Sequence, residues 1–300
     1  MGIVSADCAF LFYAKKLNVN FKDTCTLGRL VLYADKNDIR DCLVKYQNGA
    51  KQLDKVKFTD EYSEPLFEIL GTEKLVTVDY SSYENASVIH DLNNPFPESM
   101  KNSFSCVLDS GTLEHVFNFP VAIKSCMEAV RVGGHYIGIT PVNNQMGHGF
   151  YQFSPELYYR IFSEENGFRI LKMMIAVPVP GDEKTEWYDV ADPKNVSNRV
   201  MVVNNFPLSL MFIAEKIADK NIFEKAPHQS DYTSTWNAFT SVKENNAELS
   251  GGSLALLYKK FLPYRIKVIL RNLYDIYKKE KIETTGLGVI NPEYFKKTTI

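Results

Sequence analysis

The chain has no closely spaced cysteines and no long hydrophobic run. Its five cysteines, Cys8, Cys25, Cys42, Cys106 and Cys126, include no C-x-x-C pair, so neither a zinc pattern nor a disulfide framework is indicated. No apolar stretch approaches the roughly 20 residues that a membrane span needs, and no basic leader precedes the short N-terminal apolar run. We therefore expect buried thiols in a cytoplasmic protein without stable membrane insertion.

An excess of charge of either sign is also missing. The chain contains 34 Lys and Arg against 36 Asp and Glu, which argues against a broad nucleic-acid-binding face and against nucleic acid as a partner. The G-x-G-x-x-G motif of nicotinamide-binding sheets is absent after the first expected strand, where Gly28 stands alone. This absence counts against an oxidoreductase that uses a dinucleotide.

What is present is a large apolar fraction, 45% of 300 residues, arranged as alternating strands and helices. We expect strands over 23–27, 75–79, 87–91, 104–109, 135–140, 168–177 and 208–216, and helices over 6–17, 35–47, 65–70, 120–130 and 154–162. Alternation of this kind favours a mainly parallel α/β sheet with helices on both faces. The stretch 178–207 is expected to be a loop with a short helix over 196–203.

The composition changes near Lys220, which predicts two parts. We expect a main domain over 1–220 and a C-terminal extension over 221–300. In the extension, 226–252 is polar and turn-rich, and 253–281 reads as a basic amphipathic helix with a kink at Pro263. This helix is expected to pack on the main domain or to provide a homodimer contact.

Three expected strands end in an acid: Asp79, Asp91 and Asp109. Open α/β sheets bind ligands at the carboxyl ends of their strands. A carboxylate at the position of Asp79 can accept both hydroxyls of a ribose, and Asp91 can accept an adenine amine while Leu92 offers a backbone amide and an apolar contact. The alternative is that these acids only cap helices or hold turns.

Glycines and polar residues accompany two of these strand ends. After the first strand, Leu27, Gly28 and Arg29 are candidates for a ligand-binding turn, although Gly28 alone is also typical of a simple turn. After Asp109, Ser110 is expected to face the crevice and Gly111 to allow a tight turn.

Two histidines are candidate proton acceptors. His115, beside Glu114, follows the acid-ended strand, and His148 stands between two glycines in an amide-rich loop that should cover the same crevice. Either histidine could be the general base, with Glu114 orienting it or taking that role. Alternatively, His115 packs beneath the next helix, and the loop is an ordered lid without chemistry.

The same loop offers candidate substrate-binding side chains, namely Asn143, Asn144, Tyr151 and Gln152, because amides and aromatic rings suit hydroxyl-rich ligands. We expect no metal site, because the histidines lack ligand-type spacing and no cluster of acids accompanies them. An acid-acid-His arrangement around Glu114 and His115 would need an acid where Gly111 stands.

Several of these runs resemble those of class I S-adenosylmethionine (SAM)-dependent methyltransferases. The runs are Asp109-Ser-Gly-Thr-Leu-Glu-His-Val, Ala129-Val-Arg-Val-Gly-Gly-His-Tyr-Ile, Glu165-Asn-Gly-Phe and Leu210-Met-Phe-Ile-Ala-Glu-Lys. The resemblance covers roughly 23–216 and implies a seven-stranded Rossmann-like sheet that binds SAM. It departs from the family where Thr26-Leu-Gly-Arg replaces a glycine-rich loop.

A narrower resemblance concerns the run Met146-Gly-His-Gly-Phe-Tyr-Gln-Phe-Ser-Pro-Glu, which is similar to bacterial methyltransferases of surface-polysaccharide synthesis. Together the resemblances imply methyl transfer from SAM to an oxygen, or less favourably a nitrogen, of a small polar acceptor such as a sugar or glycan precursor. The alternative is a non-catalytic SAM- or nucleotide-binding protein, because the first loop is degenerate.

Overall fold

The computed structural model describes residues 2–47, 49–179, 185–196, 199–234 and 287–300, together with a few positions between 236 and 285. The chain divides into two compact units. The first comprises Met1–Val190, Asn205–Pro227 and Lys296–Ile300, and the second comprises Ala191–Asn204 and His228–Phe295. The expected helix over 253–281 lies outside the described residues, apart from Pro263 and Ile266.

A nine-stranded sheet forms the core of the first unit, in the order β14-β9-β8-β11-β7-β6-β2-β4-β5. Its strands are β2 (Asp23–Leu27), β4 (Lys74–Asp79), β5 (Val88–Ile89), β6 (Phe104–Ser110), β7 (Val130–Asn143), β8 (Phe168–Pro178), β9 (Thr185–Val190), β11 (Leu208–Lys216) and β14 (Phe295–Thr298). The strands from β5 to β7 are parallel, whereas β11, β8 and β9 are joined by antiparallel pairing.

The predicted mainly parallel, seven-stranded sheet is therefore wrong in detail, although the α/β class is confirmed. Two strands were missed, β9 in the stretch that was expected to be a loop and β14 in the C-terminal extension, and β11 pairs in antiparallel fashion with both of its neighbours. Residues Thr185–Val190 form β9, Pro193–Val196 form the short helix α6 and Val202–Val203 form β10. Because β9 follows β8 directly, without a crossover helix, the two strands pair in antiparallel fashion.

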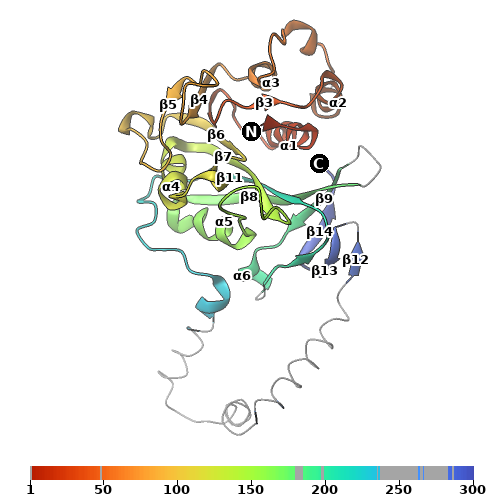
Figure 1. Cartoon of the computed structure of the whole chain (residues 1–300), viewed down its shortest axis with the longest axis vertical. Helices are drawn as coiled ribbons and strands as arrows, with labels where there is room; N and C mark the ends of the chain where they lie inside the picture. The colour runs from red at the N-terminus through yellow and green to blue at the C-terminus, as the bar shows by residue number, and fades with distance from the viewer. Residues whose placement is uncertain are drawn as a thin grey trace. The chain divides into compact units, whose positions relative to one another are not determined.

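Helices cover both faces of this sheet, as Figure 1 shows, with α1 to α3 on one side of the central strands and α4 and α5 on the other. The helices are α1 (Ser5–Lys16), α2 (Lys36–Gln47), α3 (Glu64–Leu70), α4 (Phe119–Ala129) and α5 (Pro155–Ile161), with short 3-10 helices η1 (Leu53–Lys55), η2 (Glu98–Met100), η3 (Leu113–His115) and η4 (Glu164–Asn166). No described helix has the length and hydrophobicity that a membrane crossing needs.

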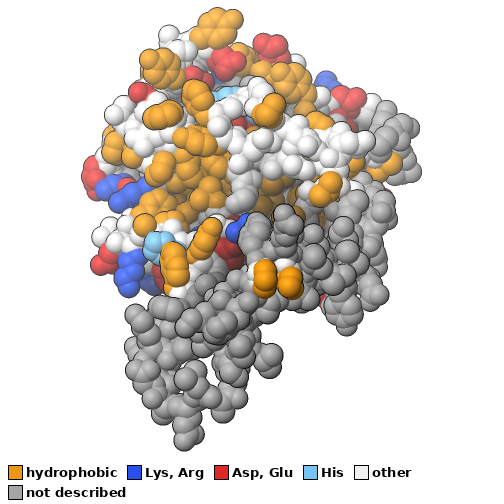
Figure 2. All heavy atoms as spheres, turned by 60° about the horizontal axis from the view of Figure 1, so that its bottom comes forward, with side chains coloured by type: hydrophobic (Ala, Val, Ile, Leu, Met, Phe, Trp, Pro, Cys, Tyr) orange, Lys and Arg blue, Asp and Glu red, His pale blue; other side chains and the backbone are white. Residues whose placement is uncertain are grey.

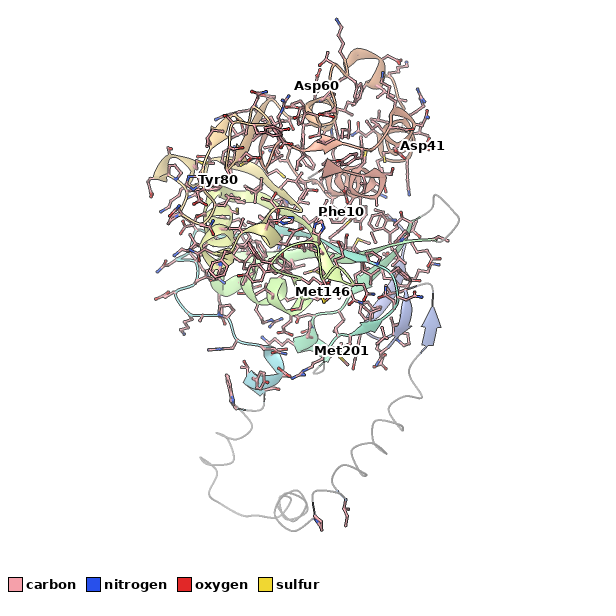
Figure 3. All side chains as sticks on the ribbon, viewed as in Figure 1. Phe10, Asp41, Asp60, Tyr80, Met146 and Met201 are labelled. Atoms are coloured by element: carbon pink, nitrogen blue, oxygen red, sulfur yellow. The ribbon has the colours of Figure 1, made fainter. Side chains whose placement is uncertain are left out.

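The two faces of the sheet have different cores because neighbouring residues of a strand point to opposite sides. On the face of α1, Phe10 and Leu11 pack in one buried cluster with Leu108 and Ile137, and Figure 3 shows Phe10 beside the strands. On the other face, the adjacent residue Tyr136 belongs to an aromatic cluster with Tyr158, Phe162 and Phe212.

Smaller pairings complete the described part of the chain. In the first unit, β1 (Gly2–Ile3) pairs in parallel with β3 (Val31–Leu32). In the second unit, β10, β13 (Gly288–Ile290) and β12 (Glu283–Thr285) form an antiparallel sheet. The extension was expected to hold a loop and a helix, so strands at its C-terminal end are a difference from that expectation. Figure 2 shows hydrophobic side chains gathered on one face, with charged side chains nearby.

The start of α1 contains a buried acid that predicts a pH dependence of stability. The Asp7 carboxylate accepts a hydrogen bond from the backbone N–H of Val4 at 3.0 Å, and burial raises the pKa of Asp7 to about 7. A folded-state pKa above the unfolded value means that folding favours the protonated acid. Its contribution to stability is therefore present at low pH and is lost as the pH rises from about 4 to 7, by at most about 1.4 kcal/mol per pH unit.

We expect Asp7→Asn to remove this contribution. As the pH rises from 4 to 7, the free energy of unfolding of the variant should increase relative to that of the wild type. Urea unfolding at each pH measures this difference. The exposed Asp41 on α2 supplies a matched Asp→Asn control at the surface. Parallel profiles for the wild type and Asp7→Asn would contradict the raised pKa of Asp7.

Candidate functional site

A cavity of about 370 Å³ opens at the carboxyl ends of the parallel strands. The chain runs from β2 outward to β4 and β5, and then returns to the other side of β2 to form β6 and β7. This reversal of strand order leaves a crevice at the sheet edge, where open α/β sheets bind their ligands. The cavity is lined by Gly28, Val78, Asp79, Tyr80, Asp91, Leu92, Asn93, Thr112, His115 and Val116.

Half of these lining residues were predicted from the sequence: Gly28, Asp79, Asp91, Leu92 and His115. The others were missed, although each is close in sequence to a predicted residue. Tyr80 follows Asp79 and extends into solvent beyond the end of β4, where Figure 3 labels it. A signal for it was available, because an aromatic residue directly after a strand-end acid can stack on a flat ligand.

The two carboxylates of the cavity are held by local hydrogen bonds. Asp79 Oδ1 accepts the backbone N–H of Ser81 at 3.2 Å. Asp91 accepts the backbone N–H of Asn93 at 2.9 Å and the side-chain amides of Asn93 and Asn94, and the Asn93 backbone hydrogen bond, helped by the Asn93 side chain, lowers the pKa of Asp91. Asp91 is thus a fixed, ionised acceptor at the rim of the cavity.

The turn after β2 brings only backbone to the cavity. Gly28 has a φ of +82°, a conformation that favours glycine, and its N–H donates to the carbonyl of Val78 at 2.6 Å. Leu27 is buried and accepts the Thr112 hydroxyl through its carbonyl at 2.7 Å. Neither Leu27 nor Arg29 lines the cavity.

Arg29 is occupied elsewhere. Its guanidinium contacts the carboxylates of Glu64 at 2.6 Å and Asp60 at 3.3 Å, and it stacks over the ring of Tyr62 at 3.7 Å from the centroid. It also donates to the carbonyl of Glu84 at 3.2 Å. These contacts give Arg29 the role of fixing neighbouring loops, so it contributes no free cation to the cavity.

Asp109 lies beneath the cavity and not in its wall. Its buried carboxylate accepts the backbone N–H groups of Thr112 at 2.9 Å and Leu113 at 3.3 Å, and the hydroxyl of Tyr136 at 3.3 Å. Burial raises the pKa of Asp109 to about 6, against these hydrogen bonds. Asp109 therefore holds the turn that presents Thr112 and, three residues later, His115.

Ser110 and Gly111 also serve this turn without lining the cavity. The Ser110 hydroxyl donates to the carbonyl of Gly2 at 3.4 Å. Gly111 has a φ of +83°, and a Cβ at this position would lie 3.4 Å from Oε1 of Glu114. A contact of this length is ordinary, so Gly111 is needed for the conformation of the turn rather than for space.

The loop after β7 packs against η3 and places a second histidine beside His115. The backbone N–H groups of Phe150 and Tyr151 both donate to the carbonyl of Glu114, at 2.8 and 3.2 Å. The His115 and His148 rings lie with their centroids 5.2 Å apart. The loop therefore lies beside His115, but none of its residues is among those that line the cavity.

Glu114 lies between these histidines and the protein interior. Its side chain is 0% exposed, and its Oε1 is 3.4 Å from Nε2 of His148. Burial, with a smaller contribution from the charge of Asp109, raises the pKa of Glu114 to about 8. Burial and the neighbouring His148 lower the pKa of His115.

The predicted substrate-binding residues mostly fix the loop to neighbouring segments. Asn143 is the last residue of β7 and pairs with Leu208, and the Asn144 side chain donates to the carbonyl of Phe206 at 3.0 Å. Gln152 accepts the backbone N–H of Gln145 at 2.8 Å, and the Tyr151 hydroxyl donates to the carbonyl of Phe117 at 2.7 Å. None of the four predicted residues lines the cavity.

Exposed apolar side chains lie close to the two histidines in the chain. Phe117 and Phe150 meet edge to face, with ring centroids 6.2 Å apart, and they are 74% and 68% exposed. Met146, in the same loop, is 89% exposed, and Figure 3 labels it. Sequence reasoning missed this apolar rim, although Phe150 and Met146 flank His148 closely in the chain.

No protein-family model and no curated protein matches the sequence, whereas many solved structures are similar in fold. A candidate methyltransferase from Bacillus halodurans is 9% identical over 71% of this chain and 100% of that chain, with a TM-score of 0.38. A branched-chain polyamine synthase from Thermus thermophilus, in complex with N4-aminopropylspermidine and 5'-methylthioadenosine, is 14% identical over 77% and 63%, with a TM-score of 0.38.

A third structure is the 1,6-didemethyltoxoflavin-N1-methyltransferase of Burkholderia thailandensis, with bound 1,6-didemethyltoxoflavin and S-adenosylhomocysteine. It is 10% identical over 71% of this chain and 78% of that chain, with a TM-score of 0.38. At such identities and scores, the ligand and activity of this chain have to be inferred from its own residues.

Proposed function

We propose that the chain is a SAM-dependent methyltransferase that acts on an oxygen of a small polar acceptor. The observation that carries this proposal is the composition of the cavity at the reversal of strand order. Asp79 and Asp91 face one space of about 370 Å³, and no Lys or Arg is among its lining residues. A volume of this size falls within the range of small-molecule sites, about 300–1,000 Å³.

The charge of the cavity favours SAM over a phosphorylated nucleotide. Two carboxylates and no basic side chain would repel a pyrophosphate, and the single Gly28 offers little backbone for one. SAM instead carries a sulfonium and an ammonium group. Asp79 would accept the ribose hydroxyls and Asp91 the adenine amine, with Leu92 against the ring and Tyr80 beside it.

We assign supporting roles to the predicted residues that do not line the cavity. Asp109, Ser110 and Gly111 form the turn that positions Thr112 and His115, and Leu27 anchors the same turn through its carbonyl. Arg29 stabilises the neighbouring loops. In this proposal the cofactor is bound mainly by the ends of β4 and β5.

The acceptor is proposed to approach from the side of His115 and His148. Its oxygen forms a bond to the methyl carbon, the carbon–sulfur bond breaks with its electron pair moving to sulfur, and S-adenosylhomocysteine remains. The hydroxyl proton must also leave, and His148, His115 and Glu114 are the polar groups at this side that can assist. The aromatic side chains of Phe117, Phe150 and Tyr151 suit the apolar faces of a sugar, which supports a sugar or glycan precursor as the acceptor.

Calorimetric titration tests the cofactor directly. We expect SAM and S-adenosylhomocysteine to bind at least about tenfold more tightly than NAD or ATP, a difference of about 1.4 kcal/mol. Equal or tighter binding of NAD or ATP would contradict the proposal. With SAM binding established, release of S-adenosylhomocysteine in the presence of sugar acceptors distinguishes an enzyme from a non-catalytic SAM-binding protein.

A further inference from the structure

Three potential metal ligands from two separate segments converge beside the cavity. Each of Glu114, His115 and His148 offers one ligand atom, and these atoms all lie within 4.8 Å of one another. Two ligands of one ion lie about 3.4 Å apart when each is about 2.1 Å from a tetrahedral ion. The distance from Oε1 of Glu114 to Nε2 of His148, 3.4 Å, already has this value.

The Glu114 carboxylate gives an independent indication of a cation. Its side chain is fully buried, and neither of its oxygens has a hydrogen-bond partner among the described residues. A buried carboxylate without hydrogen bonds is costly unless it is neutralised or coordinates a cation.

The backbone of the loop is built to bring His148 to this carboxylate. A Cβ on Gly149 would lie 2.8 Å from the carbonyl oxygen of Glu114, so only glycine allows this approach. The carbonyl also receives the N–H groups of Phe150 and Tyr151. His148 itself remains about half exposed, which leaves the site accessible from solvent.

We propose that Glu114, His115 and His148 form a binding site for one divalent transition-metal ion of the zinc class. Two imidazoles and one carboxylate are the donors of catalytic zinc sites, which keep a further position open. Imidazole donors favour such an ion over magnesium, which prefers oxygen ligands. This proposal differs from the expectation from sequence that the chain has no metal site.

The consequence for catalysis rests on the proposed methyl transfer, whereas the metal site does not. His115 lines the cavity, so an ion held by this trio would present its open position towards the acceptor. An acceptor hydroxyl bound to a divalent ion loses its proton to water more readily. The histidines would then act as ligands and not as bases.

Titration of chelator-treated protein with Co²⁺, a spectroscopic substitute for Zn²⁺, tests the site without SAM. We expect one equivalent of Co²⁺ to produce visible absorption. Zn²⁺ should displace the Co²⁺ and abolish this absorption, whereas Mg²⁺ should leave the absorption unchanged. His148→Ala should lower Co²⁺ affinity at least tenfold. Because His148 is half exposed, this variant should fold. Glu114→Gln tests the carboxylate ligand in the same way, but it changes a buried residue and is therefore more disruptive to folding.

The control is His228→Ala, which changes an exposed histidine outside the trio and should bind Co²⁺ as the wild type does. Absence of Co²⁺ binding in the wild type, or equal binding by His148→Ala, would overturn the metal site. Titration with SAM in the presence of chelator separates the two proposals. Binding of SAM without Co²⁺ binding rejects only the metal site, and binding of Co²⁺ without SAM rejects only the proposed function.

Discussion

Replacing Asp109 by Ala is expected to lower the free energy of unfolding by about 3 to 5 kcal/mol. The Asp109 carboxylate receives three donors, the N–H groups of Thr112 and Leu113 and the hydroxyl of Tyr136, and it is almost fully buried. Truncation leaves these donors without their acceptor, at about 1–3 kcal/mol for each one that stays buried. Urea unfolding of the two proteins measures the difference.

Two further variants separate the loss of the acceptor from general disruption of the core. Tyr136→Phe removes only one of the three donors and should cost about 1 kcal/mol. Asp109→Asn keeps an acceptor oxygen for the turn, and because burial disfavours the charge of Asp109, it should be milder than Ala. If Ala costs no more than Asn, the carboxylate does not hold the turn.

Strands flanked by clear signals could be predicted from the sequence. The limits of β2 (Asp23–Leu27) and β11 (Leu208–Lys216) agree with the expectation. The β-branched threonines of β2 and the apolar run of β11 are typical of strands, and polar or turn residues bound each of them. The cavity-lining acids Asp79 and Asp91 could also be predicted, since the carboxyl ends of neighbouring parallel strands share one edge.

Gly133 and Gly134, which stand between the expected helix over 120–130 and the expected strand over 135–140, show what local sequence cannot supply. Both residues lie within β7, and the pairing of β6 with β7 shifts register between Phe104 and Cys106. A Cβ on Gly134 would lie about 3.0 Å from the carbonyl oxygens of Phe104 and Ser105. This glycine allows close approach of two strands, a tertiary requirement that looks like turn chemistry in the sequence.

The direction of a strand-end side chain is a second limit. Asp79 and Asp109 lie near the ends of β4 and β6, yet only Asp79 lines the cavity. Leu27 pairs with both Val78 and Asp109, so Asp79 lies one residue further along its strand than Asp109 does. The turn through Gly111 directs the backbone N–H groups of Thr112 and Leu113 to the Asp109 carboxylate. The spacing of residues along the sequence does not reveal this. The meeting of Glu114 with His148 likewise depends on a loop whose path follows from packing.

The largest expected effect on ligand binding belongs to Asp79. Asp79→Ala should weaken SAM binding about 30- to 100-fold, measured by calorimetry, because a bidentate carboxylate loses two charge-assisted hydrogen bonds to the ribose, worth about 2 to 3 kcal/mol. The side chain is only partly buried and has one local backbone contact, to Ser81. We therefore expect little change in folding stability.

A matched control is Asp41→Ala, which removes an exposed carboxylate from α2, at a position that Figure 3 labels, and should leave SAM affinity unchanged. A second ligand sharpens the result: 2'-deoxy analogues of SAM lack one of the two ribose hydroxyls, so they should lose less affinity than SAM on truncation of Asp79. If SAM binds Asp79→Ala as tightly as the wild type, the ribose does not lie at the end of β4, and the proposed orientation of the cofactor is wrong. Because Asp91 also lines the cavity, two residues after the neighbouring strand β5, the combined Asp79→Ala and Asp91→Ala variant then decides whether this edge of the sheet binds SAM at all.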